Sequence, residues 1–152
     1  ASCKAVERIA DADIIVIGPG SLYTSIIANL IIPDISEAII NSRAKKVFIC
    51  NIMSEEGETD RLDCYGHLEK ITDHVKNLKI DYMLINNKII ESDILERYDR
   101  EHKHPVYVDD SQRAKIRELG VQIIEDNLLR VSETGQIMHD SEKVARILLD
   151  IL

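Results

Sequence analysis

The sequence predicts an α/β protein, a three-layer sandwich built on a mainly parallel sheet. Short, continuously apolar runs rich in Ile and Val alternate along the chain with segments of helical character. Runs of this kind are typical of strands buried on both faces, and their alternation with helices implies parallel strands joined by right-handed crossovers. A length of 152 residues suits one domain, so we expect residues 1–152 to form a single α/β unit.

The elements follow one another in a regular order. The opening "CKAVERIADAD" is typical of the last turns of a helix that leads into a strand. The apolar runs predict strands over 13–18, 46–51, 81–86, 105–109 and 121–126. The segments between and after them predict helices over 22–30, 34–43, 62–78, 92–102, 111–119 and 141–151. Near the end, "NLLRVSETGQIMH" predicts short strands that form an irregular or antiparallel edge.

Local signals support several of these helices. Ser111 and Ser141 are candidate N-caps, because a serine hydroxyl can accept a hydrogen bond from a free N–H of the first turn. Gly120 is suited to end the helix over 111–119. The helix over 62–78 has one apolar face, formed by Leu68, Ile71, Val75 and Leu78.

Charge and composition exclude several classes of partner. With 19 Lys and Arg against 27 Asp and Glu, the net charge is −8. This balance argues against nucleic acid or an anionic membrane as the main partner. No apolar run approaches the roughly 20 residues that a membrane helix needs, and the N-terminus has no apolar signal-peptide core. We therefore expect a cytoplasmic protein that does not insert into a membrane.

The cysteines are odd in number and lack CxxC spacing. Cys3, Cys50 and Cys64 therefore predict reduced thiols, with neither a disulfide frame nor a zinc site. Cys50 lies inside an apolar strand run, where we expect a buried, inert thiol.

The first candidate site is the junction "IGPGSLYTS", where a strand leads through Gly18, Pro19, Gly20 and Ser21 into a helix beginning near Leu22. In a parallel sheet, ligands bind beyond the carboxyl ends of the strands. The helix would direct its free N–H groups and its positive dipole end towards an anion above Gly20. The hydroxyls of Ser21, Thr24 and Ser25 could add donors. The junction is neither a P-loop nor a GxGxxG motif, and the alternative is a tight turn capped by Ser21.

The second candidate site is the loop in "CNIMSEEGETDRLDCYGHL", which follows the next strand. We expect a helix to open near Thr59 or Asp60, which would make the neighbouring acids Glu55, Glu56 and Glu58 helix-start residues. The functional alternative is a loop that faces a ligand. In that case Asn51 and Ser54 would hydrogen-bond polar groups, and the carboxylates could hold Mg²⁺ against a phosphate.

Further candidates carry two interpretations each. Tyr98 could stack on a base or sugar, or pack its ring and expose its hydroxyl. Arg130 could pair with phosphate, or form a surface ion pair. His67 and His74 lie one heptad apart without a third ligand, so they predict no metal site. No catalytic residue is assigned.

The run "DIIVIGPGSLYTSIIANLIIPDISEAI", followed by "KVFICNIMSEEGETD", closely resembles the gluconeogenesis-factor family. That family is homologous to the 2-phospho-L-lactate transferases of deazaflavin coenzyme synthesis. The resemblance continues through "ERYDREHKHPVYVD" and the terminal helix. It implies a Rossmann-like domain that binds a nucleotide-containing ligand. Family members are longer and begin with a glycine-rich loop after a first strand, so we expect this chain to be the second half of the family domain.

The resemblance also implies site residues. The phosphate-side motif is matched by Gly18, Pro19, Gly20, Ser21, Leu22, Tyr23, Thr24 and Ser25. The second loop is matched by Asn51, Met53, Gly57, Glu58, Thr59 and Asp60, and a histidine on the following helix is matched by His67. Ser54 stands where many members carry Thr and retains the hydroxyl. Tyr98 and Arg130 fall where the regulator branch has sugar-nucleotide contacts.

Two functions follow from the resemblance. Bacterial members resemble regulators that bind UDP-sugars and support cell-envelope synthesis and cell shape on gluconeogenic carbon sources. Archaeal relatives transfer a phospholactyl-type group with Mg²⁺. We expect a non-catalytic regulator that binds a UDP-sugar or a dinucleotide, with a Mg²⁺-dependent transferase as the alternative. A third interpretation is a scaffold whose ligand contacts lie mostly in the rest of the family domain. The sequence leaves the base, the sugar and a homo-oligomeric state open.

Overall fold

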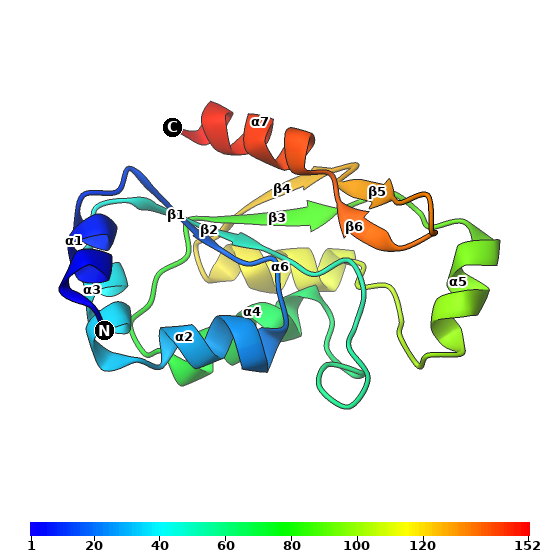
Figure 1. Cartoon of the computed structure of the whole chain (residues 1–152), viewed down its shortest axis with the longest axis horizontal. Helices are drawn as coiled ribbons and strands as arrows, with labels where there is room; N and C mark the ends of the chain where they lie inside the picture. Colours follow the sequence, from blue (N-terminus) through cyan, green and yellow to red (C-terminus); the bar gives the residue numbers. More distant parts are fainter.

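A computed structural model describes residues 1–152 and contains a four-stranded sheet in the order β1-β2-β3-β4 (Figure 1). All three strand pairs are parallel, which confirms the predicted fold class. The strands are β1 (Ile14–Ile17), β2 (Lys45–Ile49), β3 (Tyr82–Asn86) and β4 (Gln122–Asp126). A separate antiparallel hairpin is formed by β5 (Leu129–Val131) and β6 (Ile137–His139), within the segment where short strands are predicted.

Helices cover both faces of the sheet. The segment after β1 forms η1 (Leu22–Ile27), α2 (Ala28–Leu30) and α3 (Pro33–Asn41). The others are α1 (Cys3–Ala10), α4 (Cys64–His74), α5 (Ser92–Asp99), α6 (Asp110–Glu118) and α7 (Ser141–Ile151). Figure 1 shows α2, α4 and α6 below the sheet and α7 above it.

The core has one cluster on each face, because successive strand residues point to opposite sides of the sheet. Phe48 and Met83 belong to the larger cluster, together with the apolar face of α4. Val47 and Leu84 belong to the smaller one, which is closed by Val144 of α7. The four residues predicted to form one apolar face, Leu68, Ile71, Val75 and Leu78, are all buried, and so is Cys50.

The predicted strand over 105–109 is wrong. Burial alternates there, with Val106 buried and Tyr107 exposed, so this run is not a central strand. Its backbone pairs with the loop after β2 instead. Pro105 forms an isolated antiparallel bridge with Met53, and the N–H of Val106 donates to the carbonyl of Ile52 at 2.9 Å.

Several helix ends also differ from the predictions. The first turns after β1 are π-wound, with Ile26 N–H donating to the carbonyl of Ser21 at 3.0 Å. The helix expected over 62–78 is shorter, because Asp63 caps its start and accepts from Gly66 N–H at 2.7 Å. The acids before it therefore lie in turns and not in a helical first turn. The helix over 92–102 ends at Asp99.

The N-caps are not Ser111 and Ser141, as predicted, but the acidic residues Asp109 and Asp140 that precede them. Asp109 accepts from Gln112 N–H at 2.8 Å, and Asp140 accepts from Lys143 N–H at 3.2 Å. A carboxylate before each serine is therefore the N-cap, so α6 starts one residue earlier than predicted, whereas α7 starts at Ser141 as predicted. Gly120, with φ +81°, follows the end of α6 as predicted.

No single helix has the length and apolar composition of a membrane span. Only the bent pair formed by residues 22–30 and 33–41, at 74° to each other, satisfies both criteria when the two are taken together.

Candidate functional site

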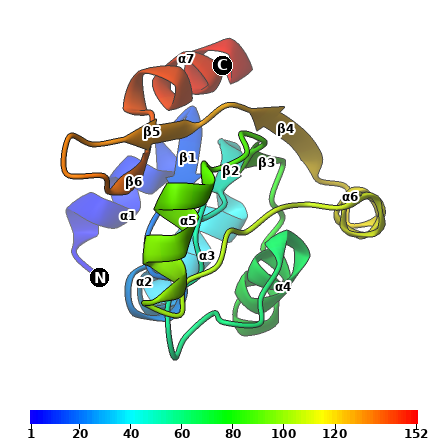
Figure 2. The ribbon, with the colours of Figure 1, turned by 90° about the vertical axis from the view of Figure 1, so that its right-hand side faces the viewer.

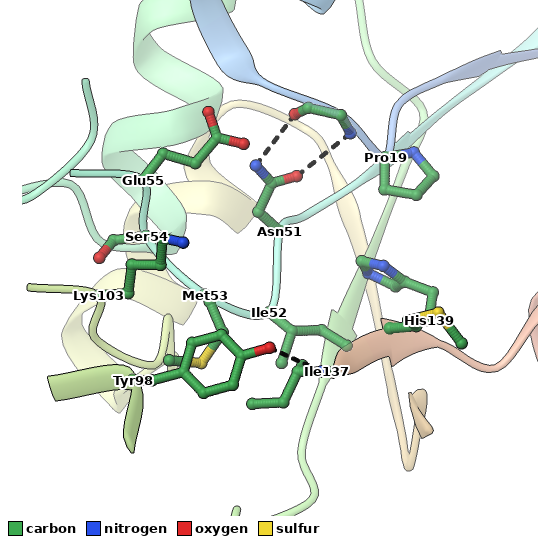
Figure 3. Close-up of a pocket in the computed structure, with 12 residues that line it drawn as sticks. Pro19, Asn51, Ile52, Met53, Ser54, Glu55, Tyr98, Lys103, Ile137 and His139 are labelled. Carbon is green, nitrogen blue, oxygen red and sulfur yellow. Dashed lines mark hydrogen bonds between the residues drawn. The ribbon is translucent and has the colours of Figure 1, made fainter. Parts of the chain in front are cut away.

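A cavity of about 420 Å³ lies beyond the carboxyl ends of β1 and β2. Its walls come from the turn after β1, the loop after β2, the α5 region and the β5–β6 hairpin. Figure 2 shows α5, β5 and β6 from the side of the strand ends. Twelve residues line it: Pro19, Gly20, Asn51, Ile52, Met53, Ser54, Glu55, Tyr98, Lys103, Ile137, Met138 and His139 (Figure 3). Parallel α/β sheets bind ligands at this end.

Asn51 holds the turn after β1 in place. Its side-chain amide donates to the carbonyl of Gly20 at 3.0 Å and accepts from the N–H of Gly20 at 3.4 Å (Figure 3). The Asn51 amide thus both donates to and accepts from the backbone of Gly20, as the backbone of a neighbouring strand would. The backbone N–H groups of Ser21 and Leu22 have no protein acceptor and lie at the start of η1.

A carboxylate already stands beside this helix start. Ser21 Oγ donates to Glu58 Oε2 at 2.7 Å, and Thr24 Oγ1 donates to Ser21 Oγ at 2.7 Å. Negative charge is stabilised at a helix N-terminus, so Glu58 occupies part of the environment that the sequence predicts for an anion. An incoming phosphate would compete with Glu58 for the Ser21 hydroxyl.

The loop after β2 is held by its own polar side chains. Thr59 is buried, and its hydroxyl accepts from the N–H of Glu55 at 2.8 Å. Ser54 Oγ accepts from the N–H of His104 at 2.8 Å, and the N–H of Ser54 donates to the carbonyl of His104 at 2.7 Å. These bonds place Glu55 and Met53 at the cavity wall.

Tyr98 joins α5 to the hairpin. Its hydroxyl accepts from the N–H of Ile137 at 2.7 Å (Figure 3), and the neighbouring Arg97 donates to the carbonyls of Thr134 and Gly135. The ring of Tyr98 lines the cavity. The hydroxyl of Tyr98 is therefore engaged within the protein and not exposed as the second interpretation expected, while the ring is positioned where stacking on a ligand stays a prediction.

The two partly or fully buried histidines near these segments differ in position. Burial lowers the pKa of both His67 and His139, which favours neutral rings. His67 lies outside the cavity lining; its Nδ1 is 2.8 Å from the carbonyl of Asp63, and its buried Nε2 has no partner. His139 lines the cavity, with Nε2 3.1 Å from the carbonyl of Cys50.

The cavity gathers six of the residues that the sequence indicates: Pro19, Gly20, Asn51, Met53, Ser54 and Tyr98. Gly18 and Ser25 line a neighbouring hollow of about 300 Å³ on the other side of the turn. Arg130 is exposed on β5 without an ion-pair partner, opposite Met138 in the hairpin register. The other predicted residues lie outside the cavity lining: Ser21, Leu22, Thr24, Glu58, Thr59 and His67.

Sequence reasoning missed the hairpin wall and Lys103. Ile137, Met138 and His139 reach the cavity because β6 folds back over the end of β2, a contact that no local pattern encodes. No group of three or more His, Cys, Asp or Glu side chains is arranged to hold a metal ion. Two carboxylates lie near the turn, that of Glu55 at the cavity wall and that of Glu58 beside Ser21.

Known proteins are similar to this chain in sequence and in fold. The family model described as "2-phospho-L-lactate transferase CofD" matches residues 1–129. The gluconeogenesis factor of Bacillus subtilis is 38% identical over 149 residues, which is 98% of this chain and 46% of that protein. The gluconeogenesis factor of Halalkalibacterium halodurans is 40% identical over 147 residues, 97% of this chain and 44% of that protein.

A solved structure supports the same relationship. A crystal structure of a Bacillus halodurans protein matches with a TM-score of 0.90 and 38% identity, over 97% of this chain and 46% of that one. The chain therefore spans less than half the length of these relatives. These similarities in sequence and fold show that the chain belongs to the family of 2-phospho-L-lactate transferase CofD.

Proposed function

We propose that the cavity binds a nucleotide-linked sugar and that the chain acts as part of a non-catalytic regulator of the gluconeogenesis-factor kind. The ligand is a UDP-sugar. The regulator acts in the cytoplasm and supports cell-envelope synthesis and cell shape on gluconeogenic carbon sources. The observation that carries the proposal is one cavity beyond the strand ends, whose lining combines polar residues such as Asn51 and Lys103 with the apolar side chains of Met53, Ile137 and Met138.

The polar end suits a diphosphate. The unpaired N–H groups of Ser21 and Leu22 lie outside the cavity lining, but they directly follow the lining residue Gly20 and lie where the dipole of η1 is positive. Lys103 is the cation of the cavity wall, although it pairs with Glu101 at 2.7 Å. Arg130 has no ion-pair partner and stands across the hairpin from a wall residue, so its guanidinium is available to a phosphate at the rim.

The apolar end suits a flat ring. Met53, Met138 and Ile137 line this part of the cavity together with the ring of Tyr98. Thioethers pack favourably against aromatic edges and adapt to irregular shapes, and ligand cavities commonly combine such walls with a few polar groups. A uracil or sugar ring is therefore the moiety we place against this wall.

Calorimetry with two probes tests the proposal. Arg130→Ala should weaken the binding of UDP-glucose about tenfold to a hundredfold, because a charge-assisted hydrogen bond contributes roughly 1.5–3 kcal/mol. The binding of uridine, which carries no diphosphate, should not change. Arg146→Ala is the control, since Arg146 is exposed on α7 outside the cavity. Equal losses for both probes would make Arg130 a structural residue, and no binding of UDP-glucose by the unmodified chain would refute the proposed function.

A second candidate is a Mg²⁺-dependent transferase that moves a phospholactyl-type group from a nucleotide-linked donor. The contact between Glu58 and Ser21 favours it, because this carboxylate stands next to the hydroxyl and helix start that would meet the phosphate. Glu58 and Glu55 would share the metal with the phosphate oxygens.

Glu58→Gln separates the two functions. In a regulator without metal, the substitution removes a carboxylate that competes with phosphate, so UDP-glucose should bind more tightly and Mg²⁺ should have no effect. In a transferase, the same substitution should weaken the Mg²⁺-dependent binding and abolish turnover. Glu56→Gln is the control, because Glu56 is an exposed neighbour on the same loop.

A further inference from the structure

His139 borders two cavities, as Pro19 does. It lies at the end of β6, and its ring borders both the main cavity and an apolar hollow of about 460 Å³ that is lined by Pro19 and α7. Figure 3 shows the ring beside Pro19. Its Nε2 approaches the carbonyl of Cys50, the residue that follows β2, at 3.1 Å.

The carbonyl of Cys50 decides which nitrogen carries the proton. A backbone carbonyl can only accept, so Nε2 must be the protonated nitrogen and must donate. Burial lowers the pKa of His139, which keeps the ring neutral near pH 7. Nδ1 is therefore an unprotonated acceptor. It has no hydrogen-bond partner in the protein, and it is not among the polar atoms shielded from solvent.

We propose that His139 recognises the ligand through Nδ1, which accepts a hydrogen bond from a hydroxyl group of the bound sugar. This inference rests on the proposed function and adds the residue that selects a hydroxyl donor. Other polar side chains of the wall already have hydrogen-bond partners: the amide of Asn51 pairs with Gly20, and the hydroxyl of Ser54 accepts from His104. The carboxylate of Glu55 is a further acceptor on the wall, and it lies on a different segment.

Two substitutions distinguish ligand recognition through Nδ1 from a role in which His139 only supports the fold through its bond to Cys50. His139→Gln places an amide N–H near the position of Nε2, so it retains the bond to Cys50 and removes the acceptor at Nδ1. His139→Asn places an amide near the position of Nδ1, so it retains an acceptor and loses the bond to Cys50. Recognition predicts that His139→Gln weakens UDP-glucose binding about tenfold and that His139→Asn binds nearly as well as the unmodified chain.

A purely supporting role predicts the reverse order, with normal binding by His139→Gln and weaker binding by His139→Asn. Either that order or unchanged binding by His139→Gln would overturn the proposal. His74→Gln is the matched control, because His74 is exposed on α4 outside the cavity.

Nitrogen-15 NMR of the free protein tests the proposal without any ligand. The expected state of His139 at pH 7 is the neutral tautomer with the proton on Nε2. A proton on Nδ1, or a cationic ring, would overturn the proposal. If the unmodified chain does not bind UDP-glucose at all, the proposed function fails and the ligand role of His139 fails with it. That outcome differs from a failure of His139 alone, which appears only as a difference between variants.

Discussion

Two glycines in one turn have different physical roles. Gly18 has φ +83°, and a Cβ there would lie 3.0 Å from the carbonyl oxygen of Ile49 and 3.2 Å from Cδ1 of Ile26. The backbone of Gly20 does not have a positive φ, and a Cβ added there would make only an ordinary contact with Ser25 Cβ at 3.4 Å. The first glycine is required by the backbone, whereas the second leaves room above the turn.

Gly18→Ala should therefore lower the free energy of unfolding by about 1–3 kcal/mol, from the left-handed backbone and the crowded Cβ together. Gly20→Ala is the matched control and should change stability by less than about 1 kcal/mol. Urea denaturation of both variants measures the difference. Similar stabilities for the two variants would contradict this account. We further expect Gly20→Val to fold and to bind UDP-glucose more weakly, because the larger side chain blocks the approach to the turn.

At the level of single elements, the hydrogen bond from the Ile137 N–H to the Tyr98 hydroxyl acts as a tether between α5 and the hairpin, and it can be tested directly. Tyr98→Phe removes the acceptor of the Ile137 N–H, at a cost of about 1 kcal/mol. The hairpin also carries Met138 and His139, so the binding of UDP-glucose should weaken about threefold to tenfold. Tyr107→Phe is a close control, because the Tyr107 hydroxyl accepts from the N–H of Ile90 at 3.1 Å but lies outside the cavity. It should lose similar stability and no affinity; an equal loss of affinity in both variants would argue against the tether.

The junction between α6 and β4 predicts a pH dependence. Arg113 binds Glu125 through two bonds, Nε to Oε1 at 2.7 Å and Nη2 to Oε2 at 2.8 Å. These bonds lower the pKa of Glu125 in the folded state. A carboxyl with a lowered folded pKa stabilises the fold above its unfolded pKa, and that contribution is lost as the pH falls through the folded value.

Glu125→Gln should therefore lower the melting temperature at neutral pH, and the difference from the unmodified chain should disappear in acid. Thermal denaturation across pH 3–7 measures the effect. Glu118→Gln, at an exposed position of α6 without an ion pair, should show no such trend. A difference that grows towards low pH would contradict the assigned sign.

The sequence predicts the central elements well and the peripheral ones poorly, for a physical reason. Runs such as "VFIC" are apolar throughout because both of their faces are covered, and this is a local signal. The run at 105–109 is also apolar, yet its backbone bonds go to the loop after β2, which is a distant partner. The starts of α4 and α6 differ from the predictions because Asp63 and Asp109 accept the capping bonds, and at α7 the cap is Asp140 in place of Ser141.

The residues of the candidate site also fall into those that the local sequence predicts and those that it does not. The turn after β1 and Asn51 could be predicted, because both directly follow apolar strand runs. Lys103 and His139 could not, because each reaches the cavity through a loop or hairpin that folds back over the strand ends. The geometry also assigns Thr59 and His67 to the support of the loop and helix, and places neither in the cavity lining.

For the whole molecule, the central and the edge strands of the sheet differ. β2 and β3 each have a neighbour on both sides, whereas β1 pairs with β2 alone and β4 with β3 alone. β1 is also less covered, with Val16 40% exposed, while Phe48 and Met83 in the central strands are buried. Apolar hollows of about 300 and 460 Å³ lie beside the turn that ends β1, and Pro19 lines both.

This difference should be visible in the rate at which backbone amides exchange their hydrogen for deuterium. Amides of β2 and β3 are protected by neighbours on both sides and should exchange only when the whole domain opens. Those amides of β1 that point away from β2 have no strand to hold them, so they should exchange on the timescale of exposed loops. Mass spectrometry of peptic fragments over minutes to hours measures this contrast. Equal protection across the four strands would mean that something covers the outer edge of β1 in solution, and the slow amides would then mark where it lies.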